Sequence, residues 1–300
     1  MYFREIKMIK LQTPVEIGKS KFGISLKDRI LICGSCFADN VGGKIKAAGF
    51  NVCANPFGTL YNPVSVCNSF ARLRSGSLFG EDDIVQMGSG SELFCSFSHH
   101  TSFARESRTD FLENANRKLS ESADFYRQCN TIIITLGTSW CFKHIPDGEI
   151  VSNCLKRNAN EFERVFIESD MTFGLLRRLV EEGASSMEYP KKFIFTVSPI
   201  RHMKDGAHGN QISKASLLLA IEKLCRLYPE SCEYFPAYEI VLDELRDYRF
   251  YAEDMVHPSE LAVKYIWEKF CDFAVSETDR LAIASNERIF RQSLHIQKKF

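Results

Sequence analysis

The chain has 300 residues, 45% of them hydrophobic and 25% charged, a balance typical of a globular protein with a full core. Basic and acidic residues number 38 each, so net charge gives no argument for a nucleic acid or an anionic membrane as partner. No stretch approaches the ~20 apolar residues of a membrane span, and the first residues lack the apolar core of a signal peptide. Eleven scattered cysteines, an odd number, predict free thiols in the reducing cytoplasm.

Short apolar segments and amphipathic segments alternate along the chain. Buried strands are predicted from β-branched and aromatic content at 30–33, 50–54, 131–136 and 192–197, with a weaker fifth near 232–235. Helices are predicted from apolar spacing of three and four at 37–48, 62–74, 171–182, 213–227 and 259–273. This alternation predicts an α/β fold, a three-layer α/β/α sandwich with a central parallel sheet.

One domain spanning residues 1–300 is the expected organisation, because no repeat, low-complexity tract or linker divides the chain. Two stretches fit the alternation poorly, at about 75–127 and 140–166. We expect them to be insertions at strand ends, where α/β proteins build their sites. Residues from about 277 to 300 predict a polar helical tail outside the sheet.

Ser35 stands where the first strand gives way to the first helix. Gly34 before it allows a sharp backbone turn, and the helix N-terminus favours developing negative charge. Ser35 is therefore a candidate nucleophile with its own N–H as oxyanion donor; the alternative is an ordinary helix cap.

Asp254 and His257 form an Asp-x-x-His sequence just before Pro258 and the last amphipathic helix of the sheet region. A carboxylate three residues upstream can bond one ring nitrogen, which leaves the other free to take a proton. Together with Ser35 these residues predict a Ser-His-Asp site for acyl or ester chemistry, if the fold joins the two ends of the chain.

The five residues from Gly34 to Ala38 read Gly-Ser-Cys-Phe-Ala, which resembles the signature of the GSCFA family. That family is similar to the SGNH (GDSL-like) hydrolases. Further blocks resemble the family, at 55–59, 135–138, 153–154, 196–202 and 254–258. The resemblance implies an SGNH-hydrolase-like, flavodoxin-like fold with Ser35 as nucleophile, His257 as base and Asp254 as its orienter. It also implies that the Gly58 N–H helps form the oxyanion hole.

The superfamily's third oxyanion donor, an asparagine two residues after a glycine, is replaced here. Gly137 is followed by Thr138 and Ser139, so serine stands at that place. Ser139, Thr138 or Asn153 could donate the hydrogen bond instead. Cys36, next to the nucleophile candidate, is included among the predicted oxyanion and substrate-binding residues.

Arg201 and His202 follow a predicted strand and a proline turn. Arg201 could hold a substrate carboxylate or phosphate, with His202 lining the pocket. The alternative is a structural arginine paired with an acidic loop residue.

Two other chemistries have weaker signals. Cys33 and Cys36 form a Cys-x-x-Cys sequence at a strand–helix junction, as in thiol redox proteins. Two pairs of histidines, 99–100 and 202 with 208, lack a third ligand at a recognisable spacing, so no metal is expected. Because the chain also lacks a phosphate loop and a dinucleotide fingerprint, no cofactor is expected.

The function expected from these signals is a serine esterase or deacylase that acts through an acyl-enzyme on Ser35. Its substrate would be a small-molecule or carbohydrate ester. Two alternatives stay open: an O-acyltransferase with the same triad, and a non-catalytic binding module on a degraded hydrolase fold, suggested by the missing asparagine.

Overall fold

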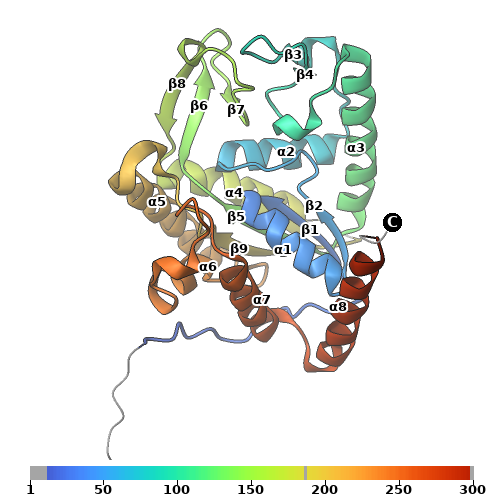
Figure 1. The fold of residues 1–300 in the computed structure, drawn as a ribbon, viewed down its shortest axis with the longest axis vertical. Coiled ribbons are helices and arrows are strands. Elements are labelled where there is room, and N and C mark those ends of the chain that lie inside the picture. Colours follow the sequence, from blue (N-terminus) through green and yellow to red (C-terminus); the bar gives the residue numbers. More distant parts are fainter. Residues whose placement is uncertain (1–11, 186–187, 298–300) are drawn as a thin grey trace, which may run out of the picture.

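A parallel sheet of five strands runs through the middle of the molecule (Figure 1). The structure is a computed structural model and describes residues 12–185 and 188–297. The five strands are β1 (Arg29–Gly34), β2 (Asn51–Ala54), β5 (Thr131–Leu136), β9 (Lys192–Val197) and β10 (Cys232–Tyr234). Their order across the sheet is β2-β1-β5-β9-β10, and every neighbouring pair is parallel.

The order of the strands reverses between β1 and β5. From β1 the chain adds β2 on one side, whereas β5, β9 and β10 follow one another on the other side. In doubly wound sheets such a reversal opens a crevice beyond the carboxyl ends of the strands, where ligands bind. The topology therefore places the expected site next to the carboxyl end of β1.

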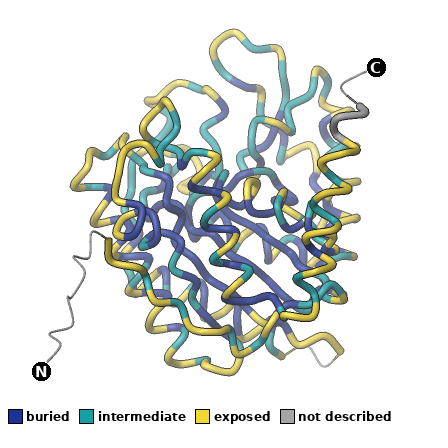
Figure 2. Tube along the Cα trace, turned by 60° about the horizontal axis from the view of Figure 1, so that its bottom comes forward, coloured by how far each residue is buried: buried dark blue, intermediate teal, exposed yellow. Residues whose placement is uncertain are grey.

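Helices cover both faces of the sheet, so the predicted three-layer α/β/α sandwich is confirmed. Leu31 of β1 faces one helical layer, whereas Ile30 and Ile32 face the other, because successive side chains of a strand alternate in direction. The first layer comprises α2 (Pro63–Ser75), α3 (Arg108–Gln128), α4 (Ser169–Ala184) and α5 (Gly206–Leu227). The second comprises α1 (Cys36–Ala47), α7 (Glu260–Ala274) and α8 (Glu277–Gln297), with the short α6 (Ala237–Glu239) beside them. Figure 2 shows the buried residues in the interior of the molecule, and the strands β1, β5 and β9 are buried at nearly every position.

The predicted strands all form, and those at 131–136 and 192–197 match residue for residue. The N-cap predicted at Asn62, before Pro63, is confirmed, since Asn62 Oδ1 accepts the N–H of Ser65. Ser259 caps α7 in the same way, with its Oγ accepting the N–H of Ala262. The helical tail forms as α8 and packs beside α1, where Asn286 Nδ2 donates to the carbonyl of Ala48 at 3.0 Å. Residues 298–300 of the predicted tail lie outside the described residues.

The predicted insertion at about 75–127 contains a helix that was not predicted from the sequence, because its second half is the 21-residue helix α3. Ser107 caps this helix, and its buried face is a stripe every three or four residues that includes Phe111, Ala115, Leu119 and Tyr126. The small alanines and the many polar residues between them hide that stripe in the sequence. The irregular part is shorter and holds only the two-residue strands β3 (Val85–Gln86) and β4 (Phe94–Cys95) as its sheet.

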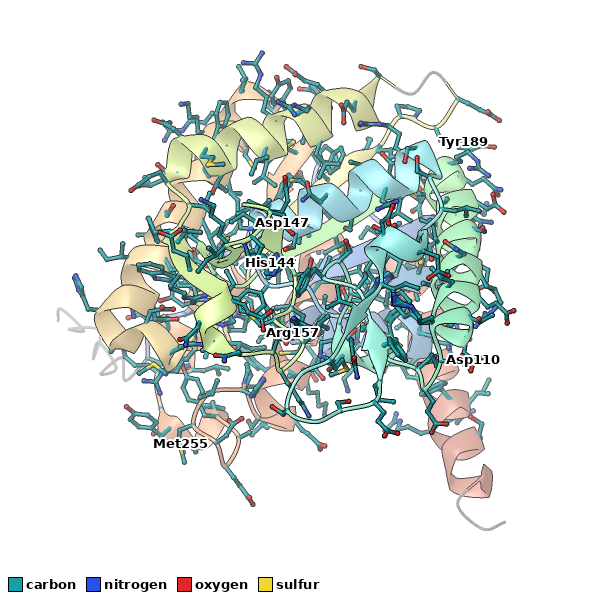
Figure 3. The ribbon with its side chains drawn as sticks, turned by 90° about the horizontal axis from the view of Figure 1, so that it is seen from above. Asp110, His144, Asp147, Arg157, Tyr189 and Met255 are labelled. Carbon is teal, nitrogen blue, oxygen red and sulfur yellow. The ribbon has the colours of Figure 1, made fainter. Side chains whose placement is uncertain are left out.

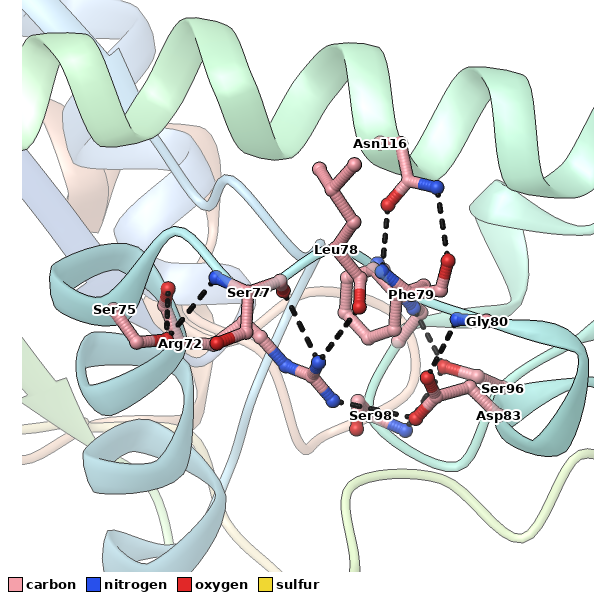
Figure 4. Close-up of polar contacts among 11 residues, drawn as sticks. Arg72, Ser75, Ser77, Leu78, Phe79, Gly80, Asp83, Ser96, Ser98 and Asn116 are labelled. Atoms are coloured by element: carbon pink, nitrogen blue, oxygen red, sulfur yellow. Dashed lines mark hydrogen bonds and ion pairs between the residues drawn. The ribbon is translucent and has the colours of Figure 1, made fainter.

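This first insertion is fastened to the helices on either side of it (Figure 4). Arg72 of α2 donates to the carbonyls of Ser77 and Leu78 at 3.1 and 3.2 Å. Asn116 of α3 accepts the N–H of Phe79 at 2.7 Å and donates to its carbonyl at 3.0 Å. The segment between the two helices is thus held at its start from both sides.

The second predicted insertion, 140–166, is a small antiparallel sheet rather than an irregular stretch. It consists of β6 (Trp140–His144), β7 (Ile150–Val151) and β8 (Phe162–Phe166), in the order β7-β6-β8. His144 and Asp147 lie side by side at its first turn, with 2.8 Å between Nδ1 and Oδ2 (Figure 3). The N–H of Ser152 donates to the carbonyl of Phe97 at 2.8 Å, which joins the two insertions.

Candidate active site

The turn from β1 into α1 decides which side chain reaches the crevice. Gly34 has φ 146°, and a Cβ there would overlap the carbonyl oxygen of Thr135 on the neighbouring strand β5. Only glycine fits this turn, since the conformation and the close strand both exclude a side chain. The helix therefore begins immediately at Cys36.

Ser35 is the N-cap of α1 and faces the sheet. Its side chain is fully buried, and its Oγ accepts the N–H of Phe37 at 3.3 Å and lies 3.3 Å from Thr135 Oγ1. Among the hydrogen bonds of the described residues, none joins Ser35 to His257. The structure thus places Ser35 in the role of the helix cap, and the predicted contact between serine and histidine is not made.

Cys36 occupies the position predicted for the serine. Its Sγ lies 3.3 Å from His257 Nε2, and His257 Nδ1 lies 2.6 Å from Asp254 Oδ2. An ionised carboxylate can only accept, so His257 donates from Nδ1 and presents the bare Nε2 to the thiol. The structure brings together the front and back of the chain as predicted, but as a thiol–imidazole–carboxylate row.

The loop that carries Asp254 and His257 is rigidly bonded. Asp254 Oδ1 accepts the N–H groups of Val256 and His257, each at 2.9 Å. These two backbone donors, together with the His257 ring, lower the pKa of Asp254 to about 2. Between them Met255 has φ 57° and lies exposed at the surface (Figure 3). The carboxylate consequently stays ionised at any pH at which the protein would be assayed.

Arg201 supports this loop instead of facing a substrate. Its Nη1 donates to the carbonyl of Met255 at 2.9 Å, and its N–H donates to the carbonyl of Val256 at 3.1 Å. The guanidinium also lies over the rings of Tyr248 and Tyr251. Arg201 therefore has the structural role that was the alternative to binding a substrate. Its partners are loop carbonyls, however, and not the acidic side chain that this alternative expected.

The thiol of Cys36 has a raised pKa. Burial is the main cause, and the carboxylates of Asp39 and Asp254 add to it, whereas the N–H groups of Cys36 and Phe37 lower the pKa. The net rise means that the free protein holds a neutral thiol near neutral pH. A base is then needed to remove its proton, and His257 is in place to do so.

An open pocket of about 510 Å³ lies over the thiol. Its lining residues are Cys36, Asp39, Asn55, Gly58, Thr59, Tyr61, His100, Ser102, Phe103 and His257. Two larger hollows, of about 950 and 880 Å³, lie along α1, α7 and α8 and between α2 and the insertions. Neither of them is lined by Cys36 or His257, whereas the smaller pocket is lined by both.

Asp39, Asn55, His100 and Ser102 are pocket residues that received no role from the sequence. Asn55 Oδ1 accepts the N–H of Gly34 at 2.8 Å, and its Nδ2 donates to Asp39 Oδ1 at 2.6 Å. Asn55 also has φ 43°, so it is held in the left-handed region. The Asn-Pro sequence after β2 was a usable signal for Asn55, whereas only the fold brings His100 and Ser102 to this place.

Three predicted oxyanion donors are occupied elsewhere. Gly58 lines the pocket, but its N–H donates to the carbonyl of Asn55 at 2.8 Å. Thr138 Oγ1 lies 3.0 Å from Ser213 Oγ, and Ser139 Oγ donates to the carbonyl of Ser213 at 3.2 Å. Both residues are buried and join β5 to α5, so their role is structural.

Asn153 and His202 also lie outside the pocket lining. Asn153 Oδ1 accepts the N–H of Leu155 at 2.8 Å and so shapes a turn of the second insertion. His202 packs edge-on against the Tyr61 ring, and burial, with nearby Lys214 next in order, lowers its pKa to about 3. It is a neutral ring behind the pocket wall, not a pocket residue as predicted.

Cys33 points away from Cys36. Its Sγ lies 3.7 Å from Ser69 Oγ of α2, on the opposite face of the sheet, and burial raises its pKa to about 12. Both cysteines are free thiols. Cys33 lies on the face of β1 that α2 covers, whereas Cys36 begins α1 on the other face, so the two sulfurs do not form a redox pair.

The side chains described in 12–185 and 188–293 contain no group of three or more His, Cys, Asp or Glu arranged to hold a metal ion. In the same ranges no helix is both long enough and apolar enough to span a bilayer.

Fold and site together define the class: a doubly wound α/β protein whose nucleophile candidate, histidine and carboxylate meet beyond β1, next to the strand-order reversal. No curated protein matches the chain. The chain belongs to the GSCFA family, whose model matches residues 29–270, from the first residue of β1 into α7. The match includes Cys36, Asp254 and His257.

Proposed function

We propose that the protein is an acyl-transfer enzyme that hydrolyses ester bonds, with Cys36 as nucleophile, His257 as general base and Asp254 as the residue that orients the base. The observation that carries this proposal is the row from Cys36 Sγ through His257 to Asp254, with distances of 3.3 and 2.6 Å. A nucleophile within reach of a base that is itself oriented by a third group is the general arrangement of nucleophilic catalysis.

In the first half-reaction the sulfur of Cys36 attacks the ester carbonyl carbon, and His257 Nε2 takes the thiol proton. The carbonyl oxygen becomes an oxyanion. Its collapse breaks the bond to the alcohol oxygen, which leaves with the proton from His257, and a thioester remains on Cys36. Water then attacks the thioester while His257 takes its proton. The carboxylic acid leaves, and the sulfur recovers its proton.

The charges around the row suit this sequence of steps. Because burial raises the pKa of Cys36, sulfur and proton separate only as the substrate is attacked. Asp254, with its pKa near 2, then stabilises the imidazolium that forms beside it. Cys36 is the first residue of α1, and the first N–H groups of a helix have no partner within the helix. The Cys36 N–H is therefore one donor for the oxyanion.

The substrate proposed is a small O-acylated molecule, with a carbohydrate ester as one class, and the similarity of the family to SGNH hydrolases supports that choice. The same row could pass the acyl group to an alcohol instead of water. The openness of the pocket favours hydrolysis, because water can reach the thioester. Eleven free cysteines support the cytoplasm as its place.

The direct test is turnover of p-nitrophenyl acetate by the purified protein and by Cys36→Ala, with Cys154→Ala as the matched control. Cys154 is a half-buried free cysteine outside the pocket lining. We expect Cys36→Ala to lose about 10³-fold or more in rate, and the control to lose little. Mass spectrometry of the wild type should show an acetyl group on Cys36 that hydroxylamine removes. Turnover by Cys36→Ala equal to that of the wild type would reject the proposal, and a folded wild type without turnover on a panel of esters would favour the binding module.

A further inference from the structure

The oxyanion needs a second hydrogen-bond donor, and this inference rests on the proposed function. Gly58 N–H, Thr138 and Ser139 are engaged in bonds to the protein itself. In the pocket lining, the Asn55 amide is held by two bonds, since Oδ1 accepts the N–H of Gly34 and Nδ2 donates to Asp39. Another side chain of the pocket wall is therefore a better candidate for the donor.

His100 belongs to the first insertion and forms the wall at the place predicted for the Gly58 donor. A Cβ at Gly58 would overlap the Cβ of His100, so the histidine lies directly against the bare glycine backbone. The N–H of His100 donates to the carbonyl of Phe57 at 2.9 Å, which fixes it to the strand-end loop that contains Gly58. Gly58, with φ 78°, provides the space for this packing.

The bonds of the His100 ring determine which nitrogen carries its proton. The backbone N–H of Ser102 donates to Nδ1 at 3.3 Å, and Ser102 Oγ lies 3.1 Å from the same nitrogen. A nitrogen that accepts from a backbone N–H holds no proton of its own. The neutral ring is therefore protonated on Nε2, which makes that nitrogen a donor.

The His100 ring, the Asp39 carboxylate and Cys36 line one pocket. The hydroxyls of Thr59 and Tyr61 in the same lining lie 3.5 Å apart, so one of them can donate to the other. The His100 ring is held by its bonds to Ser102, and among the hydrogen bonds of the described residues none uses a proton on Nε2. His100 is thus a donor in this wall whose ring is fixed in place and whose proton is available.

We infer that His100 donates its Nε2–H to the carbonyl oxygen of the bound ester, and that it forms the oxyanion hole together with the N–H of Cys36. No proton is transferred by His100 in this role. It stabilises the negative charge that develops when sulfur attacks the carbonyl carbon. The first insertion would then supply a residue that contacts the substrate, and would not only line the pocket.

The test compares His100→Ala, His100→Gln and the control His208→Ala in p-nitrophenyl acetate turnover, since His208 is an exposed histidine of α5 outside the pocket lining. We expect His100→Ala to lower kcat about 100-fold with little change in KM, because the lost bond strengthens in the transition state. The glutamine amide can donate from a similar position, so His100→Gln should recover at least tenfold of that loss. His208→Ala should stay within a few-fold of the wild type.

A second readout is inhibition by acetaldehyde, which adds to a cysteine as a hemithioacetal whose tetrahedral carbon carries an oxygen where the oxyanion would lie. Its inhibition constant should rise in His100→Ala by a factor similar to the loss in kcat. His100→Ala active like the wild type while Cys36→Ala is inactive would overturn the role of His100 and leave the proposed function standing. Equal losses in His100→Ala and His100→Gln, with both variants folded by circular dichroism, would also overturn it. A fully active Cys36→Ala variant would overturn both the proposed function and the role of His100.

Discussion

Replacing Ser35 or Cys36 by alanine should separate stability from activity at two adjacent positions. Ser35 caps α1 and is fully buried, so Ser35→Ala leaves the N–H of Phe37 without its acceptor and Thr135 Oγ1 without its neighbour. Loss of a serine cap costs about 1 kcal/mol, and loss of a buried hydroxyl contact about 0.5–1 kcal/mol more. We therefore expect the free energy of unfolding to fall by about 1.5–2 kcal/mol, with turnover within about tenfold of the wild type.

Cys36→Ala should give the opposite result. The thiol is half-buried and contacts the His257 ring at 3.3 Å, so little stability depends on it. The free energy of unfolding should change by less than about 1 kcal/mol, while p-nitrophenyl acetate turnover falls about 10³-fold or more.

The assay pairs urea denaturation with ester turnover for both variants and the wild type. The reasoning is refuted if Ser35→Ala loses turnover as completely as expected for Cys36→Ala while remaining as stable as the wild type. That result would make Ser35 the nucleophile and the 3.3 Å contact of Cys36 with His257 incidental.

Two further predictions follow from the raised pKa of Cys36 and the lowered pKa of Lys214. Since burial raises the pKa of Cys36, its alkylation by iodoacetamide, followed by peptide mass spectrometry, should keep accelerating beyond pH 9, the ordinary value; a plateau near pH 7 would instead indicate a preformed thiolate. Lys214 is buried and donates to the carbonyls of Gly137 and Ser198, and burial lowers its pKa from 10.5 to about 7. Between these pH values the unfolded chain binds the extra proton, so stability rises with pH: relative to Lys214→Met, the wild type should gain about 2 kcal/mol from pH 7 to pH 9 in urea titrations. A difference between the two proteins that does not change with pH would contradict this.

The elements that were predicted well are those whose signal is local. The strand at 131–136 is apolar on every residue, and burial on both faces of a central parallel strand is the reason for that pattern. Asn62 was recognisable as a helix N-cap because a cap side chain bonds an N–H only three residues away. The helix α3 was not predicted because its buried positions include alanines and few large apolar side chains. The polar residues between them weaken the apolar periodicity on which the prediction depends.

The amino-acid sequence by itself determined the layered α/β fold, the turn at Gly34, and the pair Asp254 and His257 that meets the start of α1. Each of these depends on neighbours within a few residues or on simple alternation. Tertiary structure decided which of two adjacent side chains meets the histidine. The side chain of Ser35 contacts Thr135 of β5, whereas that of Cys36 faces the pocket and contacts His257. The reason is that the backbone conformation at Gly34 is fixed by β5, a strand about one hundred residues further along the chain. The tertiary structure also decided whether the predicted oxyanion donors are available. A donor that already bonds to the protein itself cannot donate to a substrate.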